Sequence, residues 1–452
     1  MDEAPPTSGA RGELFGPTRR TTTIGLLLLI VMVAFESMGV GTAMPALVAE
    51  FGAVSLYALP FVAFMAASVF GTVVGGRWCD RAGPRLVLLA GPTLFGLGLI
   101  TAGSALGMPQ VLAGRVLQGL GAGGMLVAIY VLIGVVYPER VRPPLFGLMS
   151  SGWVLPTLIG PPLAGLVTER FSWRWVFFGL VPVVAVAVAL VVPAVRRLEP
   201  PEPTSVGPAR RGVVLAAAGA AVGVSALSAS AEKPDAVGAV LALGALVLLV
   251  PSVRRLLPDG VFRAVRGIPT VVACRGLCAG VFNTATSYLP LMLTATHHWP
   301  LSVAGVPLMC GSLGWSGAAA WQGRHPDLPR PRLLRAGFCL LMIAALMLQF
   351  AAPSWGTPWL ALPVWLLAGC GMGLTFPSVS FLLLRLSEPG RVGFNTSAAQ
   401  VCDQLGSATL VGIGGTLLAL LGTPASALPV LFAVLAVLGL TGILVAPRAA
   451  VL

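Results

Sequence analysis

The sequence predicts an all-α integral membrane protein with two bundles of six helices and two extra helices between them. The chain has 452 residues, of which 56% are hydrophobic and only 10% are charged. Soluble domains carry about 25% charged residues. The mean hydropathy is +0.92 over the whole chain, and a short charged segment occurs once in each half. Together these observations indicate a duplicated, polytopic membrane protein.

The apolar runs predict fourteen membrane-spanning helices. A span needs about 20 apolar residues. The runs that meet this length are 22–47, 55–75, 86–106, 109–136, 143–167, 174–194, 213–230, 235–251, 268–293, 301–321, 333–352, 357–384, 393–421 and 425–446. Twelve is the alternative count, because 213–230 and 235–251 are short and losing both would preserve the orientation of all later loops.

The distribution of basic residues predicts the orientation. Loops that follow even-numbered spans hold most of the arginines, whereas the other side has little beyond Arg170, Arg174 and Lys233. The positive-inside rule therefore places both termini in the cytosol, with the chain in the cytoplasmic membrane. The first 20 residues do not resemble a cleaved signal peptide, so we expect the first span to be retained.

These spans divide the chain into five segments. Spans seven and eight have almost no intramembrane polar groups and are expected to face lipid, and the remaining spans divide as six plus six around them. The predicted segments are a cytosolic tail (1–21), an N-terminal bundle (22–195), a proline-rich cytosolic linker (196–212), the two inserted helices with their loop (213–267) and a C-terminal bundle (268–447).

A charged loop is predicted at the same position in both bundles. Residues 75–85 lie between spans two and three, and 323–332 occupy the equivalent place in the second bundle. Aligning the copies matches Gly76 with Gly323 and Asp80 with Asp327. Internal repeats in a membrane protein usually indicate a transporter. The second copy has Pro329 and Arg330 in place of Ala82 and Gly83. If the two copies control opening of the protein, we expect the second to do so less strongly than the first.

Several classes of function are not expected. The net charge of +12 lies in short loops, so nucleic-acid binding is not predicted. A phosphate-binding sequence G-x-x-x-x-G-K-[ST] is missing, which argues against ATP as the energy source. The seven cysteines do not form a metal-binding pattern with His, and we interpret them as small buried side chains. We therefore expect no cofactor, no metal and no enzyme activity.

Four motifs occur in the order and spacing of a known family. They are Gly76-Arg77-Trp78-Cys79-Asp80-Arg81-Ala82-Gly83-Pro84-Arg85 after span two, Arg115-Val116-Leu117-Gln118-Gly119-Leu120-Gly121 in span four, Gly152, Gly160, Pro161, Pro162 and Gly165 in span five, and Trp173-Arg174-Trp175 before span six. On these residues the chain resembles the major facilitator superfamily, and in particular its fourteen-span drug:proton antiporter branch. Glu36 stands where that branch usually has an Asp.

The resemblance implies proton-coupled export of a small amphiphilic compound, of the multidrug or metabolite class, by alternating access. Protons, the small-molecule substrate and membrane lipid are the implied partners, and the family-like state is a monomer. Proton-coupled uptake and uncoupled facilitated transport are the alternatives. The residues expected to control opening at the cytosolic side are Gly76, Asp80, Arg81, Gly83, Arg85 and Asp327. Asp80 is expected to stabilise the outward-facing state, and the alternative is that the arginines only set topology.

A candidate proton-coupling site lies in the N-terminal bundle. Arg115 is about 9 Å deep from the outside, and Glu36 lies about 21 Å along its span from the inside, so both fall in the outer half. A charge at this depth is costly and usually functional. We expect Glu36 and Arg115 to interact, with Gln118 and Gly119 on the same helix face as Arg115. A purely structural ion pair is the alternative.

A second candidate lies in the C-terminal bundle. Asp403 falls near the midplane of span thirteen, where the resembled branch commonly has Arg, and Gln400 shares its helix face. Arg275 lies in span nine with Asn283 on its face, at a different estimated depth. Arg275 either neutralises Asp403 or leaves it as a second titrating site.

Two further sets complete the candidate residues. In span five, Gly152, Gly160, Pro161 and Gly165 predict a tight and bendable helix interface. Trp315 and Trp365 lie deep in their spans. Each could line a pocket or simply pack in the bundle, and the sequence favours neither alternative.

Overall fold

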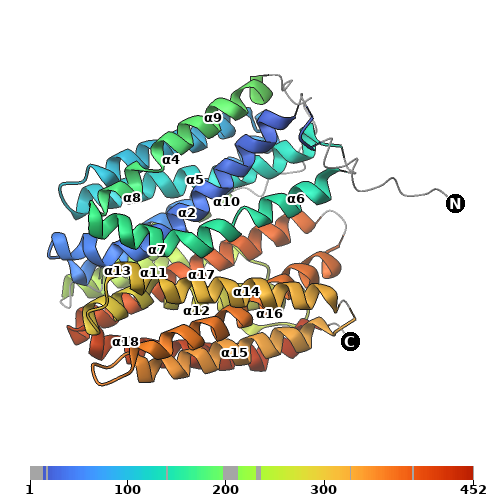
Figure 1. The fold of residues 1–452 in the computed structure, drawn as a ribbon. Helices are drawn as coiled ribbons and strands as arrows, with labels where there is room; N and C mark the ends of the chain where they lie inside the picture. The colour runs from blue at the N-terminus through green and yellow to red at the C-terminus, as the bar shows by residue number, and fades with distance from the viewer. Residues whose placement is uncertain are drawn as a thin grey trace.

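The computed structural model describes residues 14–16, 19–138, 141–196, 212–230, 236–325, 327–388 and 391–450. Over these ranges the chain is helical and contains no strand. Figure 1 shows two bundles side by side, the N-terminal bundle in blue to green and the C-terminal bundle in yellow to red. The predicted linker 196–212 and tail 1–21 lie mostly outside the described residues.

Each bundle is built from long helices with short connections. The N-terminal bundle contains α2 (Arg20–Glu50), α3 (Leu59–Ala82), α4 (Arg85–Gly103), α5 (Met108–Val136), α6 (Arg142–Ser151), α7 (Val154–Arg170), α8 (Arg174–Phe178) and α9 (Val181–Arg196). The C-terminal bundle contains α12 (Ile268–Leu291), α13 (Leu301–Ala304), α14 (Val306–Arg324), α15 (Arg330–Ala351), α16 (Ala361–Leu386), α17 (Val392–Leu421) and α18 (Pro424–Val445), followed by the 3-10 turn η6 (Ala446–Ala449).

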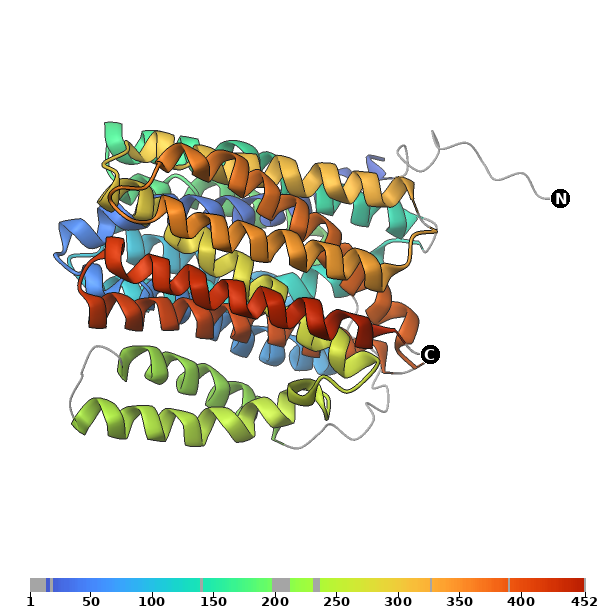
Figure 2. The ribbon, with the colours of Figure 1, turned by 90° about the horizontal axis from the view of Figure 1, so that it is seen from below.

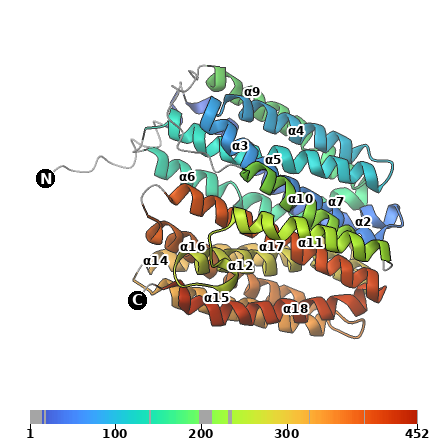
Figure 3. The same ribbon diagram turned by 180° about the vertical axis from the view of Figure 1, so that it is seen from behind.

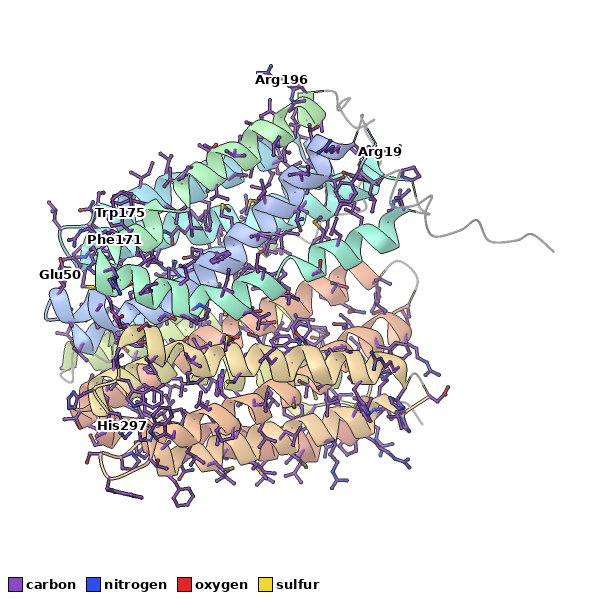
Figure 4. The ribbon with its side chains drawn as sticks, in the orientation of Figure 1. Arg19, Glu50, Phe171, Trp175, Arg196 and His297 are labelled. Carbon is purple, nitrogen blue, oxygen red and sulfur yellow. The ribbon has the colours of Figure 1, made fainter. Side chains whose placement is uncertain are left out.

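Two ends of the molecule serve as reference points. Figure 4 places Arg19 and Arg196 at one end, and Glu50, Trp175 and His297 at the other. We call these the Arg19 end and the Glu50 end. The end of α3 and the beginnings of α6 and α15 lie at the Arg19 end, because consecutive long helices alternate in direction.

Thirteen helical stretches of the described chain are long and apolar enough to cross a membrane. The predicted fifth span, 143–167, is divided into α6 and α7 by a break at Gly152 and Trp153. Pro156 has no N–H to donate to the carbonyl of Gly152, and glycine itself disfavours a helix interior, which explains the break. Together with this broken segment the arrangement is compatible with fourteen spans.

The two inserted helices are α10 (Val213–Ser230) and α11 (Ala236–Leu256). They form a pair on one side of the bundles (Figure 2). Figure 3 shows this pair across the boundary between the bundles, where α10 packs against α3 and α17. The outer helix α11 presents exposed Val240, Leu243 and Val247. An exposed apolar face of this length is expected to contact lipid.

The charged segment 75–85 is not the loop that the sequence suggested. Helix α3 continues to Ala82, so Gly76, Asp80 and Arg81 lie on its last turns, and Arg85 begins α4. That interpretation was wrong because the helix does not end where the apolar run ends: its polar last turns continue past the hydrophobic length. The chain reverses only at Gly83 and Pro84.

Substituting Gly83 with Ala is expected to destabilise this turn. Gly83 has φ 76° and ψ 173°, a region that is essentially restricted to glycine and costs another residue about 1–3 kcal/mol. Gly76→Ala is the matched control, since an added Cβ there would meet only Val127 Cγ1 at 3.7 Å. Thermal unfolding of the purified variants measures the difference. Equal melting temperatures for both variants would contradict the assigned backbone conformation.

The two bundles are joined mainly toward the Glu50 end. Tyr57 Oη donates to the carbonyl of Ser287 at 2.6 Å, and the Tyr57 and Tyr288 ring centroids are 5.3 Å apart. Near the end of α7, Ser302 N–H donates to Glu169 Oε1 at 3.0 Å. These bonds hold the bundles together at the end opposite the charged segments 75–85 and 323–332.

Candidate functional site

A buried acid–base pair connects α2 and α5 in the N-terminal bundle. Arg115 Nη1 donates to the carboxylate of Glu36 and to Oε1 of Gln118. Arg115 Nε donates to the carbonyl of Pro60 at 3.1 Å, and the guanidinium lies 4.4 Å from the ring centroid of Phe64. The structure thus brings together the first two residues predicted for proton coupling, and adds two α3 contacts that the sequence did not indicate.

This pair is almost completely enclosed. Glu36 is 0% exposed and Arg115 is 3% exposed. Glu36 Oε2 and Gln118 Nε2 have no hydrogen-bond partner among the described residues. A carboxylate can accept hydrogen bonds on both oxygens, so one oxygen of Glu36 keeps unused acceptor capacity. Arg115 thus pairs with one oxygen of this carboxylate, and the other oxygen remains open.

Gly119 explains why Arg115 can reach α3. A Cβ at Gly119 would collide with the carbonyl oxygen of Phe64 and lie 2.8 Å from Ala67 Cβ. The α3 and α5 backbones therefore approach closely, as small residues allow in membrane bundles. Gly119 acts through packing and presents no polar group to the pair.

A second buried acid–base pair connects α12 and α17. Arg275 Nε donates to Asp403 Oδ2 at 2.9 Å, and its guanidinium lies 3.4 Å from the ring centroid of Phe376. Asn283 Nδ2 donates to Ser407 Oγ at 3.0 Å along the same helix pair. Gln400 is half-buried one turn before Asp403.

Close packing of α12 and α17 makes this second pair possible. A Cβ at Gly276 would lie 2.5 Å from Cys402 Sγ, and a Cβ at Gly406 would lie 2.9 Å from the carbonyl oxygen of Gly276. The two helix axes are therefore close together. The long Arg275 side chain can reach Asp403 although the sequence placed the two residues at different depths. Arg275 and Asp403 are therefore paired in this conformation.

Four aromatic rings form a continuous row that leads to Arg275. Phe282 stacks on Trp365 with ring centroids 5.2 Å apart, and meets Trp315 edge-on at 5.6 Å. Trp315 in turn lies 5.4 Å from Phe376, the ring beneath Arg275. We call Trp365, Phe282, Trp315 and Phe376 the aromatic row. The sequence indicated only the two tryptophans, because the phenylalanines are ordinary members of apolar runs.

The structure places the predicted residues of span five in three different environments. Gly152 lies at the break between α6 and α7. Pro161 and Gly165 lie against the C-terminal bundle: a Cβ at Gly305 would be 2.7 Å from the Pro161 carbonyl carbon, and one at Gly165 would be 2.6 Å from Ser302 Cα. Gly160 faces α2 with ordinary contacts to Met38 and Phe35.

Most of the residues predicted to control opening lie at the surface, whereas Gly76 is half-buried and Gly83 is buried. Asp80 and Arg81 are exposed at the end of α3, and Asp327 is exposed in the turn between α14 and α15. Within the described ranges, Asp80 makes no ion pair. An ion pair of Asp80 across the bundle interface is therefore not formed in this conformation.

A duplicated six-helix fold with buried charge pairs on its inner helices is the architecture of a membrane transporter. The sequence profile of the Major Facilitator Superfamily matches residues 26–411. The chain belongs to this superfamily, whose members are transporters rather than enzymes.

Sequence and structure comparisons agree on the family and on the fold. The chain is 27% identical over 416 residues to an uncharacterised MFS-type transporter of Mycobacterium tuberculosis, covering 87% of this chain but 59% of that protein. It is 29% identical over 169 residues to "Multidrug resistance protein 3" of Bacillus subtilis, covering 37% of this chain and 33% of the relative. The chain therefore spans less than two thirds of these curated relatives.

The fold is also found in a solved structure of a POT family transporter bound to a thioalcohol-conjugated peptide. The TM-score is 0.70 at 14% sequence identity, and the match covers 97% of this chain and 98% of the other. At this identity the likeness establishes the arrangement of helices alone.

Proposed function

We propose that this protein exports a small amphiphilic compound across the cytoplasmic membrane in exchange for protons, by alternating access of the two bundles. The observation that carries the proposal is the pair of buried acid–base contacts, Glu36 with Arg115 and Asp403 with Arg275, one in each bundle. A buried charge that stabilised the fold alone would be costly compared with apolar packing, so its presence in a transporter supports a role in coupling.

Glu36 is the proposed proton carrier. Its Oε2 has no partner among the described residues, and Arg115 holds the other oxygen. Protonation would weaken the charge attraction to Arg115 and change the balance between conformations. Asp403 is proposed as a second site, whose release from Arg275 would permit a further proton per cycle.

The names of two relatives support export of amphiphilic compounds. One is the Bacillus subtilis protein described above, and the other is "Multidrug efflux pump SdrM" of Staphylococcus aureus, 27% identical over 171 residues. Trp315 and Phe376, the half-buried rings of the aromatic row, supply apolar surface next to a balanced charge pair. Such a surface favours molecules that combine a planar apolar part with a polar group.

The remaining parts of the proposal concern topology and gating. We propose that both termini face the cytosol, which makes the Glu50 end external, and that the protein acts as a fourteen-span monomer. Asp80, Arg81 and Asp327 would then lie at the cytosolic mouth. Asp80 would pair with an arginine across the bundle interface only when the bundles close there, and the exposed position of its carboxylate supports that role.

Transport in proteoliposomes tests the coupling and its direction. Purified protein is reconstituted with a fluorescent amphiphilic dye and an imposed pH gradient, and dye and proton movements are followed together. Export predicts that dye moves against the proton flux and accumulates on the acidic side. Movement of dye in the same direction as the protons would support the uptake alternative. A dye transport rate that does not depend on the pH gradient would support an uncoupled facilitator.

Trp315→Leu is expected to weaken interaction with planar aromatic substrates. Trp315 is half-buried and links Phe282 to Phe376. Losing one stacking partner together with its apolar area should raise the apparent KM for a planar dye about five- to tenfold. Trp355→Leu is the control, because Trp355 is 76% exposed. An unchanged KM in Trp315→Leu would show that the aromatic row only packs the bundle.

A further inference from the structure

A cavity of about 660 Å³ lies in the C-terminal bundle at the Arg19 end. Its lining comes from the turn that begins α15, the last turns of α16 and the end of η6. The lining includes Asp327, Arg330, Phe381, Arg385 and Ala449. These segments do not hold either buried acid–base pair, so the cavity is separate from the proposed coupling sites.

The charges around this cavity favour an anion. Two guanidinium groups, those of Arg330 and Arg385, line it together with one carboxylate, that of Asp327. Further arginines lie on the same segments: Arg332 is exposed on the first turn of α15, and Arg448 directly precedes the lining residue Ala449. The local field is therefore positive in spite of Asp327.

One arginine is fixed in place by its neighbours. The Arg330 guanidinium lies 4.9 Å from the ring centroid of Phe381. In the amide orientation that satisfies both groups, the Gln322 oxygen accepts from Arg330 Nη1 at 2.7 Å. A guanidinium held by an aromatic ring and an amide loses little further freedom on binding a ligand, which favours a defined anion position.

The other wall of the cavity is apolar and continues toward the membrane. Phe381 is 43% exposed, and Leu384, on the same end of α16, is 61% exposed. Basic groups at the membrane surface above exposed apolar side chains match the two parts of a phospholipid, the phosphate and the start of its acyl chains. A soluble anion would use the arginines and leave the apolar wall without a partner.

We propose that this cavity binds the headgroup phosphate of an anionic phospholipid, with Arg330 and Arg385 on the phosphate and Phe381 against the glycerol and upper acyl region. This inference does not rest on the transport function proposed above. The cavity joins the turn before α15 to the end of α16 and to η6. A bound lipid would thus hold three separate segments of the C-terminal bundle together.

Lipid binding to the full-length purified protein tests the proposal. Delipidated protein in detergent is titrated with phosphatidylglycerol, phosphatidylcholine or inorganic phosphate, and bound lipid is measured by native mass spectrometry. Wild type should bind phosphatidylglycerol more tightly than phosphatidylcholine. Arg385→Gln should weaken phosphatidylglycerol binding about fivefold, the value expected for one basic group at the membrane surface.

Two variants keep the result specific. Arg335→Gln removes an exposed charge from the same end of the molecule without touching the lining, and should retain near wild-type binding. Arg385→Lys should recover most of the lost affinity. Equal losses in Arg385→Gln and Arg335→Gln would overturn the site, and equal binding of both lipids would do the same. Full occupancy by inorganic phosphate that excludes the lipid would show a soluble-anion site and overturn the lipid assignment.

Discussion

Glu36→Gln is expected to abolish proton-driven transport and to destabilise the protein by about 3–5 kcal/mol. The substitution leaves the guanidinium of Arg115 buried without its counter-charge, and an uncompensated buried charge costs this much. Arg115 is 3% exposed, so water does not relieve the loss. Proton-driven dye transport in proteoliposomes should fall to background, while thermal unfolding in detergent should report the lower stability.

A second variant separates the two effects. The double substitution Glu36→Gln with Arg115→Gln removes both charges and should recover much of the stability, because paired amides need no counter-charge. Transport should still not respond to the pH gradient. Glu388→Gln serves as the matched control, since that carboxylate is exposed and its contact with Arg391 is 3.6 Å long. Proton-driven transport by the stable double variant would disprove the role of Glu36 in coupling.

Gly165→Ala is expected to shift the protein toward conformations in which the bundles separate at the Glu50 end. An added Cβ would lie 2.6 Å from the Leu301 carbonyl carbon and from Ser302 Cα, both backbone atoms of the opposite bundle. Overpacking of this kind costs about 1–3 kcal/mol. The equilibrium between closed and open forms should therefore change by about tenfold.

Gly160→Ala is the matched control for this prediction. It lies five positions earlier on the same helix, and its added Cβ would be 3.5 Å from Met38 Cβ, an ordinary contact within the N-terminal bundle. Double electron–electron resonance between spin labels at the ends of α7 and α13 measures the separation of the two bundles. A longer distance in Gly165→Ala alone is the expected result. Equal distances in both variants would mean that this interface does not control opening.

The sequence by itself determined the class of fold and most of the candidate residues. Backbone groups in a membrane are satisfied only in helices or closed barrels, and unbroken apolar runs of about 20 residues match helices. The length of these runs was therefore sufficient to predict the spans. Charged residues inside such runs are rare because they are costly. Glu36, Arg115, Arg275 and Asp403 could therefore be selected as candidates without any knowledge of their neighbours.

Local conformation at the ends of helices could be predicted less well. The polar residues from Gly76 to Ala82 continue α3, although hydropathy ended the span earlier. In the fifth span, hydropathy gave one helix where Gly152 and Pro156 produce two. Hydropathy measures where the chain meets lipid, whereas helix ends depend on backbone hydrogen bonds and on residues such as Gly83 that leave the helical region.

Only the tertiary structure decided which groups meet. The pairing of Arg275 with Asp403 depends on the close approach of α12 and α17 at Gly276 and Gly406, which no single span reveals. The aromatic row and the cavity beside Arg330 likewise join segments far apart in the chain. Composition and hydropathy show which segments can form helices in lipid. Contacts between helices depend on which small residues face each other, and that is decided only when the bundle packs.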